Sequence, residues 1–89
     1  MEVKKVKDLV EHVKANADEL AAKGADKKEL QAHIARLEAE LNKPAPDRGA
    51  LQGILGSLET SVEKAEESMV QKGVFQLLNQ ILGTGVPNP

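Results

Sequence analysis

The side chains best placed to do chemistry in this 89-residue chain are two histidines, each following a carboxylate by one helical turn. His12 follows Asp8 and His33 follows Glu29, so each pair could offer a metal ion one nitrogen and one oxygen ligand. A structural zinc site takes four protein ligands, and the sequence places no third ligand beside either pair. The chain has no cysteine, which excludes thiolate ligands and cysteine nucleophiles. We therefore predict no metal, no cofactor and histidines that face solvent.

Hydroxyl groups and glycines give no stronger sign of catalysis. Ser57, Ser61 and Ser68 fall on a predicted helix, without the strand-to-helix turn that exposes a serine nucleophile. The glycines of "RGALQGILG" follow no predicted strand, so they fit neither a dinucleotide-binding motif nor a phosphate loop. A helix N-terminus beside Arg48 could hold an anion, an alternative that stays open. We predict that the protein is not an enzyme.

Composition and charge exclude further classes of function. The net charge is −2, and Phe75 is the only aromatic residue, so the chain lacks the stacking side chains and basic face of a nucleic-acid-binding protein. The charged start "MEVKKVKDLVEHV" does not fit a signal peptide, and the most apolar window is too short to span a bilayer. We predict a cytoplasmic protein with no nucleic-acid partner and no membrane span. Lysines interrupted by acidic residues are typical of a solvated helix face: Lys4, Lys5, Lys7 and Lys14.

Heptad spacing predicts a pair of antiparallel helices in the first half of the chain. Gly24 is suited to end a first helix over 2–23, and Asp26 is suited to cap a second helix over 27–42. Glu29 completes a capping box with Asp26. The expected seam of the first helix is spaced three, four, three, four and three: Val3, Val6, Val10, Val13, Ala17 and Leu20.

The second half should hold a long helix and a short one. Pro44 ends the second helix, and Asp47 is the expected N-cap of a third helix over 48–72. Gly73 is expected to separate it from a last helix over 74–82, and residues 84–89 should form a loose tail. Glycines early in the third helix suggest close packing against a neighbour or, alternatively, a flexible or ligand-contacting first turn: Gly49, Gly53 and Gly56.

The run "LEAELNKPAPDRGALQGILGSLETSVEKA", residues 37–65, resembles a segment of small, uncharacterised bacterial helical proteins. In these proteins a helix ends in a Lys-Pro-x-Pro-Asp corner and a longer helix follows. Some of them look like accessory parts of bacterial defence or effector systems. The resemblance implies a bacterial interaction module and assigns no site residue.

These features predict a single all-α domain over 1–83: an antiparallel helical hairpin, a long third helix and a short C-terminal helix. We predict a non-enzymatic oligomerisation or adaptor module, with a homodimer as the first choice and another protein as an open alternative. A membrane-associated helical effector that uses "VFQLLNQIL" as an interfacial anchor is the second hypothesis. The sequence leaves open whether the last helix folds back on its own chain, swaps into a second copy or contacts a membrane. The predicted interface is apolar: Met69, Val70, Val74, Phe75, Leu77, Leu78, Ile81 and Leu82.

Overall fold

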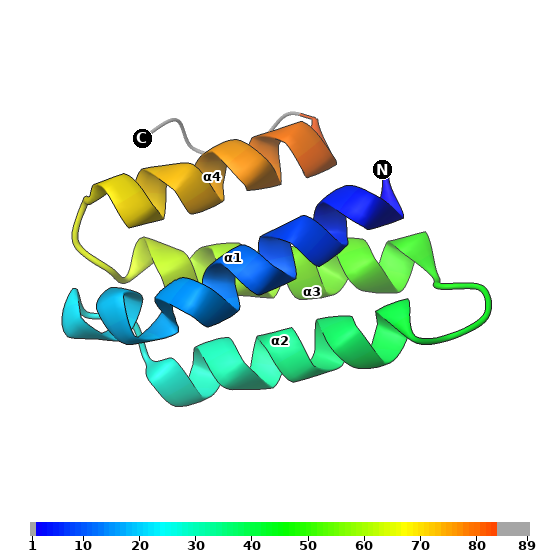
Figure 1. Cartoon of the computed structure of the whole chain (residues 1–89), viewed down its shortest axis with the longest axis horizontal. Helices are drawn as coiled ribbons and strands as arrows, with labels where there is room; N and C mark the ends of the chain where they lie inside the picture. The colour runs from blue at the N-terminus through cyan, green and yellow to red at the C-terminus, as the bar shows by residue number, and fades with distance from the viewer. Residues whose placement is uncertain (1, 84–89) are drawn as a thin grey trace.

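The computed structural model describes residues 2–83 and shows an all-helical bundle (Figure 1). The helices run antiparallel to their neighbours in the chain, with α1 in front of α3 and with α2 and α4 on either side. Each helix packs against the next, and α4 closes the bundle by packing against α1. The predicted all-α fold class is thus confirmed, while the predicted tail lies outside the described residues. The helices are α1 (Val3–Ala22), α2 (Lys27–Leu41), α3 (Arg48–Glu63) and α4 (Met69–Leu82).

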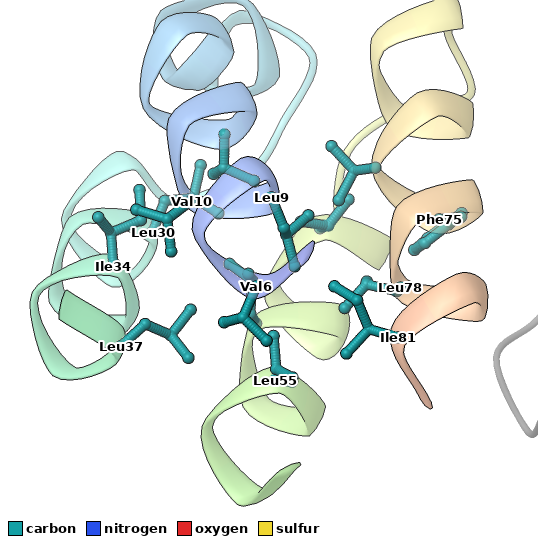
Figure 2. Close-up of a cluster of buried hydrophobic side chains, with 14 of the residues drawn as sticks. Val6, Leu9, Val10, Leu30, Ile34, Leu37, Leu55, Phe75, Leu78 and Ile81 are labelled. Atoms are coloured by element: carbon teal, nitrogen blue, oxygen red, sulfur yellow. The ribbon is translucent and has the colours of Figure 1, made fainter. Parts of the chain in front are cut away.

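Helix α1 has two apolar faces because it packs against both α2 and α4. The predicted seam is buried from Val6 to Leu20, while Val3 at its start is only partly buried. Leu9 lies outside that seam and is fully buried, so heptad spacing alone missed one of the largest core side chains. Figure 2 shows the core side chains of α1 between those of α2 and α4. The predicted seam therefore contains five of the six residues that α1 buries, and Leu9 is the sixth.

The first turn forms as Gly24 and Asp26 predict, but the predicted capping box is wrong, because the Glu29 carboxylate accepts from Ser61 and Lys64 instead. Asp26 caps α2, with its carboxylate accepting hydrogen bonds from the backbone N–H groups of Lys28 and Glu29. Gly24 has a φ of +117°, where L side chains are strained, and a Cβ there would lie 3.0 Å from the carbonyl oxygen of Lys64. The N–H of Glu66 donates to the carbonyl of Lys23 at 2.7 Å. The α1–α2 turn and the α3–α4 connection are therefore tied together at one end of the bundle.

Glu40 organises the proline corner between α2 and α3. Its side chain is buried and accepts hydrogen bonds from the backbone N–H of Asp47 at 2.9 Å and from the ammonium of Lys43 at 3.0 Å. These two donors hold the pKa of the Glu40 carboxyl below its usual range, the Asp47 N–H being the larger cause. Asp47 in turn accepts from the N–H of Gly49 at 2.9 Å, as expected of the N-cap of α3. The corner is thus fixed by side-chain bonds as well as by its prolines.

The predicted third helix over 48–72 is wrong, because α3 ends at Glu63 and α4 begins at Met69 rather than at Val74. Ser68 caps α4 by accepting from the N–H of Gln71 at 3.2 Å. The buried amide of Gln71 donates to the carbonyls of Val62 at 3.1 Å and Ala65 at 2.7 Å. Carbonyls at the end of a helix need such donors, so Gln71 stabilises the break that the sequence pattern did not show.

The glycines of α3 and Gly73 also differ from expectation. A Cβ added at Gly53 or Gly56 would have nothing within 4 Å, so the predicted close packing there is wrong. The hydroxyl of Ser57 donates to the carbonyl of Gly53 within the helix, at 3.3 Å. Gly73 does not break a helix but lies inside α4, where a Cβ would come within 3.4 Å of His12 Nε2. Its small size therefore serves the packing of α4 against α1.

Candidate functional site

The structure places most of the predicted apolar interface inside the protein's own core. Four of its residues are buried, with exposed fractions of 5% or less, as Figure 2 shows for three of them: Val74, Phe75, Leu78 and Ile81. Val70, Leu77 and Leu82 are partly buried and pack against the same core, whereas Met69 is 91% exposed. The prediction placed Met69 and Val70 at the end of a third helix over 48–72, but the chain turns after Glu63 and Ala65 is buried.

The same burial bears on the hypothesis of a membrane anchor. Phe75, Leu78 and Ile81, from the segment assigned to the anchor, pack into the core cluster of the folded chain. Within residues 2–83, no helix combines the length and the apolar character needed to cross a bilayer. The folded chain therefore does not present these three side chains to a membrane surface.

The two histidines occupy contacts between helices. His12 lies on α1 against Gly73 of α4, and its Nε2 is buried without a hydrogen-bond partner among the described residues. His33 Nε2 lies 3.1 Å from the hydroxyl oxygen of Ser61 on α3. The expectation that both histidines face solvent is therefore wrong, because a ring nitrogen of each lies at a contact with another helix. Across the described part of the chain, no group of three or more His, Cys, Asp or Glu residues is arranged to hold a metal ion.

A polar network joins α2 to α3 around Ser61. The Ser61 hydroxyl donates to Glu29 at 3.1 Å, and the ammonium of Lys64 donates to the same carboxylate at 3.0 Å. The Lys64 ammonium, followed by the Ser61 hydroxyl, holds the pKa of Glu29 below its usual range. Since the only hydroxyl proton points to Glu29, His33 Nε2 must donate to Ser61 rather than accept from it. The imidazole therefore cannot act as the general base for Ser61 in this arrangement, and the network stabilises the packing of two helices.

Glu59 on α3 is a carboxylate in an unfavourable position. Its Oε2 is buried without a hydrogen-bond partner among the described residues. Burial, followed by the nearby charge of Glu63, raises the pKa of its carboxyl. Glu59 is therefore a local cost to stability.

A surface depression lies between α1 and α2. It has a volume of about 380 Å³ and is lined only by residues of these two helices. Ala17 and Ile34 are the most buried residues of its lining. Ion pairs bridge the two helices at Lys14–Glu38, with 3.0 Å between nitrogen and oxygen, and at Lys27–Asp18, with 2.5 Å. Gln31 and Ala35 complete the lining.

A second, smaller hollow continues this depression along the same pair of helices. It measures about 190 Å³ and is lined by Lys7, Glu11, Glu38, Leu41 and Asn42. Glu38 lines both hollows, so they lie end to end. We call this surface the α1–α2 groove, defined by the residues that line the two hollows. Its lining combines short apolar side chains with lysines, carboxylates and side-chain amides.

The sequence analysis missed the α1–α2 groove although part of its signal is in the sequence. Along α1 the groove presents charged residues spaced four, three and four, with signs that alternate: Lys7, Glu11, Lys14 and Asp18. Of these residues, Lys7 and Lys14 belong to the lysines that the sequence pattern assigns to a solvated helix face. Their spacing places them on one edge of α1, and only the packing of α2 shows that this edge borders a groove.

Comparison with known proteins adds no constraint: no protein-family model, no curated protein and no solved structure matches this chain. The resemblance of residues 37–65 to small bacterial helical proteins therefore stays a prediction.

Proposed function

We propose that this protein is a non-enzymatic adaptor or oligomerisation module that binds another polypeptide along the α1–α2 groove. The observation that supports this proposal is the pair of hollows, about 380 and 190 Å³, that lie end to end between two antiparallel helices. A groove between two helices suits the ridge of side chains on a third helix. As part of the same proposal we place this activity in the cytoplasm, where a chain without cysteine needs no oxidation.

The lining of the groove suits a polypeptide better than a small apolar ligand. Ala17 and Ala35 are short and let a partner backbone approach closely, while Gln31 can both donate and accept hydrogen bonds. Charged side chains at the edges favour partners of complementary charge pattern and disfavour others. The depression is open and its charges are mostly exposed, so the partner should be a surface rather than an enclosed molecule.

Site-directed photocrosslinking tests this function, because a chain without cysteine accepts a single introduced thiol at any chosen position. Gln31→Cys carries a benzophenone into the groove, and Gln76→Cys carries the same group on the exposed face of α4 as a matched control. Both labelled proteins are irradiated in an extract of the source cells and analysed by mass spectrometry. We expect discrete polypeptide adducts from Gln31→Cys only. Equal adducts from both positions, or none from the groove, would contradict the proposal.

A further inference from the structure

The charged edge of the α1–α2 groove has a symmetry that identifies a partner. Lys7, Glu11, Lys14 and Asp18 are all exposed, and their signs alternate along α1. Lys7 and Asp18 are each four residues outside the central pair of Glu11 and Lys14, so every lysine of the row has a carboxylate at the equivalent position on the other side of the midpoint. A rotation by 180° about that point places each positive residue where a negative one was.

We infer that the partner in the α1–α2 groove is a second copy of this chain, with the two α1 helices antiparallel about a two-fold axis between Glu11 and Lys14. This inference rests on the proposed function and names its partner. In a two-fold interface, residue i of one copy meets residue j of the other, and j meets i. Lys7 then faces Asp18 of the second copy, and Glu11 faces its Lys14. All four residues of the row meet an opposite charge.

The charge row also excludes the neighbouring alignments of the same pair of helices. Sliding one α1 helix by one row position brings the axis onto Glu11 and makes Lys7 face Lys14 of the second copy. Sliding it the other way brings the axis onto Lys14 and makes Glu11 face Asp18. A parallel pair in register makes every residue face its own copy. Like charges held face to face disfavour an interface, so only the antiparallel alignment between Glu11 and Lys14 satisfies the whole row.

Contacts within the chain hold half of this row in position. Lys14 is paired with Glu38 and Asp18 with Lys27 across the groove, which orients these two side chains at its edge. Lys7 and Glu11 form no ion pair within residues 2–83, and both line the smaller hollow. A second copy would therefore supply partners to two charges that the folded chain leaves unpaired.

The size of the surface sets the strength expected of this contact. Helix α1 has 20 residues and is about 30 Å long, so a face two helices wide covers roughly 600 Å². Stable interfaces commonly bury about 800 Å² on each partner. The contact should thus be a weak, reversible dimer that is visible at hundreds of micromolar and sensitive to salt.

Charge reversal at the two central positions tests this arrangement by sedimentation equilibrium. Lys14→Glu makes Glu11 face a glutamate of the second copy, and Glu11→Lys makes Lys14 face a lysine. Each variant alone should dissociate, with a dimer Kd raised at least about tenfold. An equimolar mixture should associate again, because in the mixed pair both central contacts join Glu to Lys.

Two controls separate loss of the fold from loss of the interface. The double variant Glu11→Lys/Lys14→Glu contains both changes, keeps opposite charges across the axis and should associate more strongly than either single variant. Lys72→Glu reverses an exposed charge on α4, outside the groove, and should leave association unchanged. A monomeric wild type at hundreds of micromolar, or single variants that associate as the wild type does, would overturn the inference. Groove adducts with a different protein in the crosslinking experiment would then leave the proposed function standing.

Discussion

Glu40 is the residue on which the corner between α2 and α3 most depends. A buried carboxylate is costly unless it is hydrogen-bonded, and this one accepts from the Asp47 backbone and from Lys43. Both donors bind the charged form better than the neutral form. Folding therefore lowers the pKa of Glu40, which makes the stability of the corner depend on pH.

Replacement of Glu40 by Gln should destabilise the fold at neutral pH and have little effect in acid. Because the folded pKa is lowered, the contribution of Glu40 is full above the ordinary value of about 4.3 and is lost as the pH falls through the folded value. The measurement is the free energy of unfolding of wild type and Glu40→Gln between pH 7 and pH 2. Glu19→Gln, an exposed change on α1, is the control. A gap between wild type and Glu40→Gln that stays constant with pH would show that the charge of Glu40 does not matter.

The carboxyl of Glu59 should give stability the opposite pH dependence to that of Glu40. Its folded pKa is raised by burial and by Glu63, so the folded state binds more protons than the unfolded state and loses stability as the pH rises. Glu59→Gln removes the charge at similar size and should stabilise the protein at pH 7 by a few tenths of a kcal/mol. This advantage should shrink as the pH falls towards about 4.3, where the wild-type carboxyl is protonated when folded. Urea unfolding at pH 7 and pH 5 measures the difference, and a less stable variant at pH 7 would contradict it.

At the scale of the helices, α3 contains glycines that its packing does not require. Gly53 and Gly56 have open space where a Cβ would stand, and neither has a positive φ. An interior glycine destabilises a helix relative to alanine because the unfolded chain has more conformations to lose. These two positions are therefore the clearest candidates for stabilising the protein.

Gly53→Ala and Gly56→Ala should each raise the free energy of unfolding by about 0.5 to 1 kcal/mol. The matched control is Gly24→Ala, which places a Cβ at a φ of +117° and 3.0 Å from the Lys64 carbonyl oxygen, and should destabilise the protein. Thermal and urea unfolding followed by circular dichroism give all three values. A loss of stability at Gly53 or Gly56 would mean that α3 needs these glycines for a contact within the bundle.

Gln71 determines where α3 ends and α4 begins. Its amide donates to two carbonyls near the end of α3, and the side chain is 6% exposed. Gln71→Leu keeps the volume but leaves both carbonyls without this donor, and should cost about 1 to 3 kcal/mol. Gln76→Leu, an exposed change on the same helix, should cost little. Equal effects on the urea midpoint would show that the cap contributes nothing.

The helix boundaries show what could be predicted from the sequence and what could not. Gly24 and Asp26 mark the first turn by local chemistry, and the structure confirms the Asp26 cap. The break after Glu63 contains neither glycine nor proline, so heptad spacing continued across it. Ser68 followed three residues later by Gln71 is a capping-box pattern that could have predicted the start of α4. The contact of Gln71 with Val62 depends on tertiary structure, which no local pattern contains.

At the scale of the whole molecule, the break after Glu63 changes which surface is free to bind. It lets α4 fold back over α1 and α3, where Phe75 and Leu78 complete the core. The apolar residues of α4 predicted an interface between chains, but most of them are buried against the rest of the same chain. The α1–α2 groove is therefore the candidate binding surface in place of α4. Its charged residues can be found in the sequence, but its shape depends on how α1 and α2 pack.

A dilution series followed by ¹H–¹⁵N correlation spectra tests most directly whether the α1–α2 groove is the associating surface. On going from hundreds to a few micromolar, we expect shift changes at groove residues such as Glu11, Lys14 and the side-chain amide of Gln31. The resonances of Met69 and Leu77 on α4 should stay constant. Shifts confined to α4, or spectra that do not change with concentration, would contradict self-association through the α1–α2 groove.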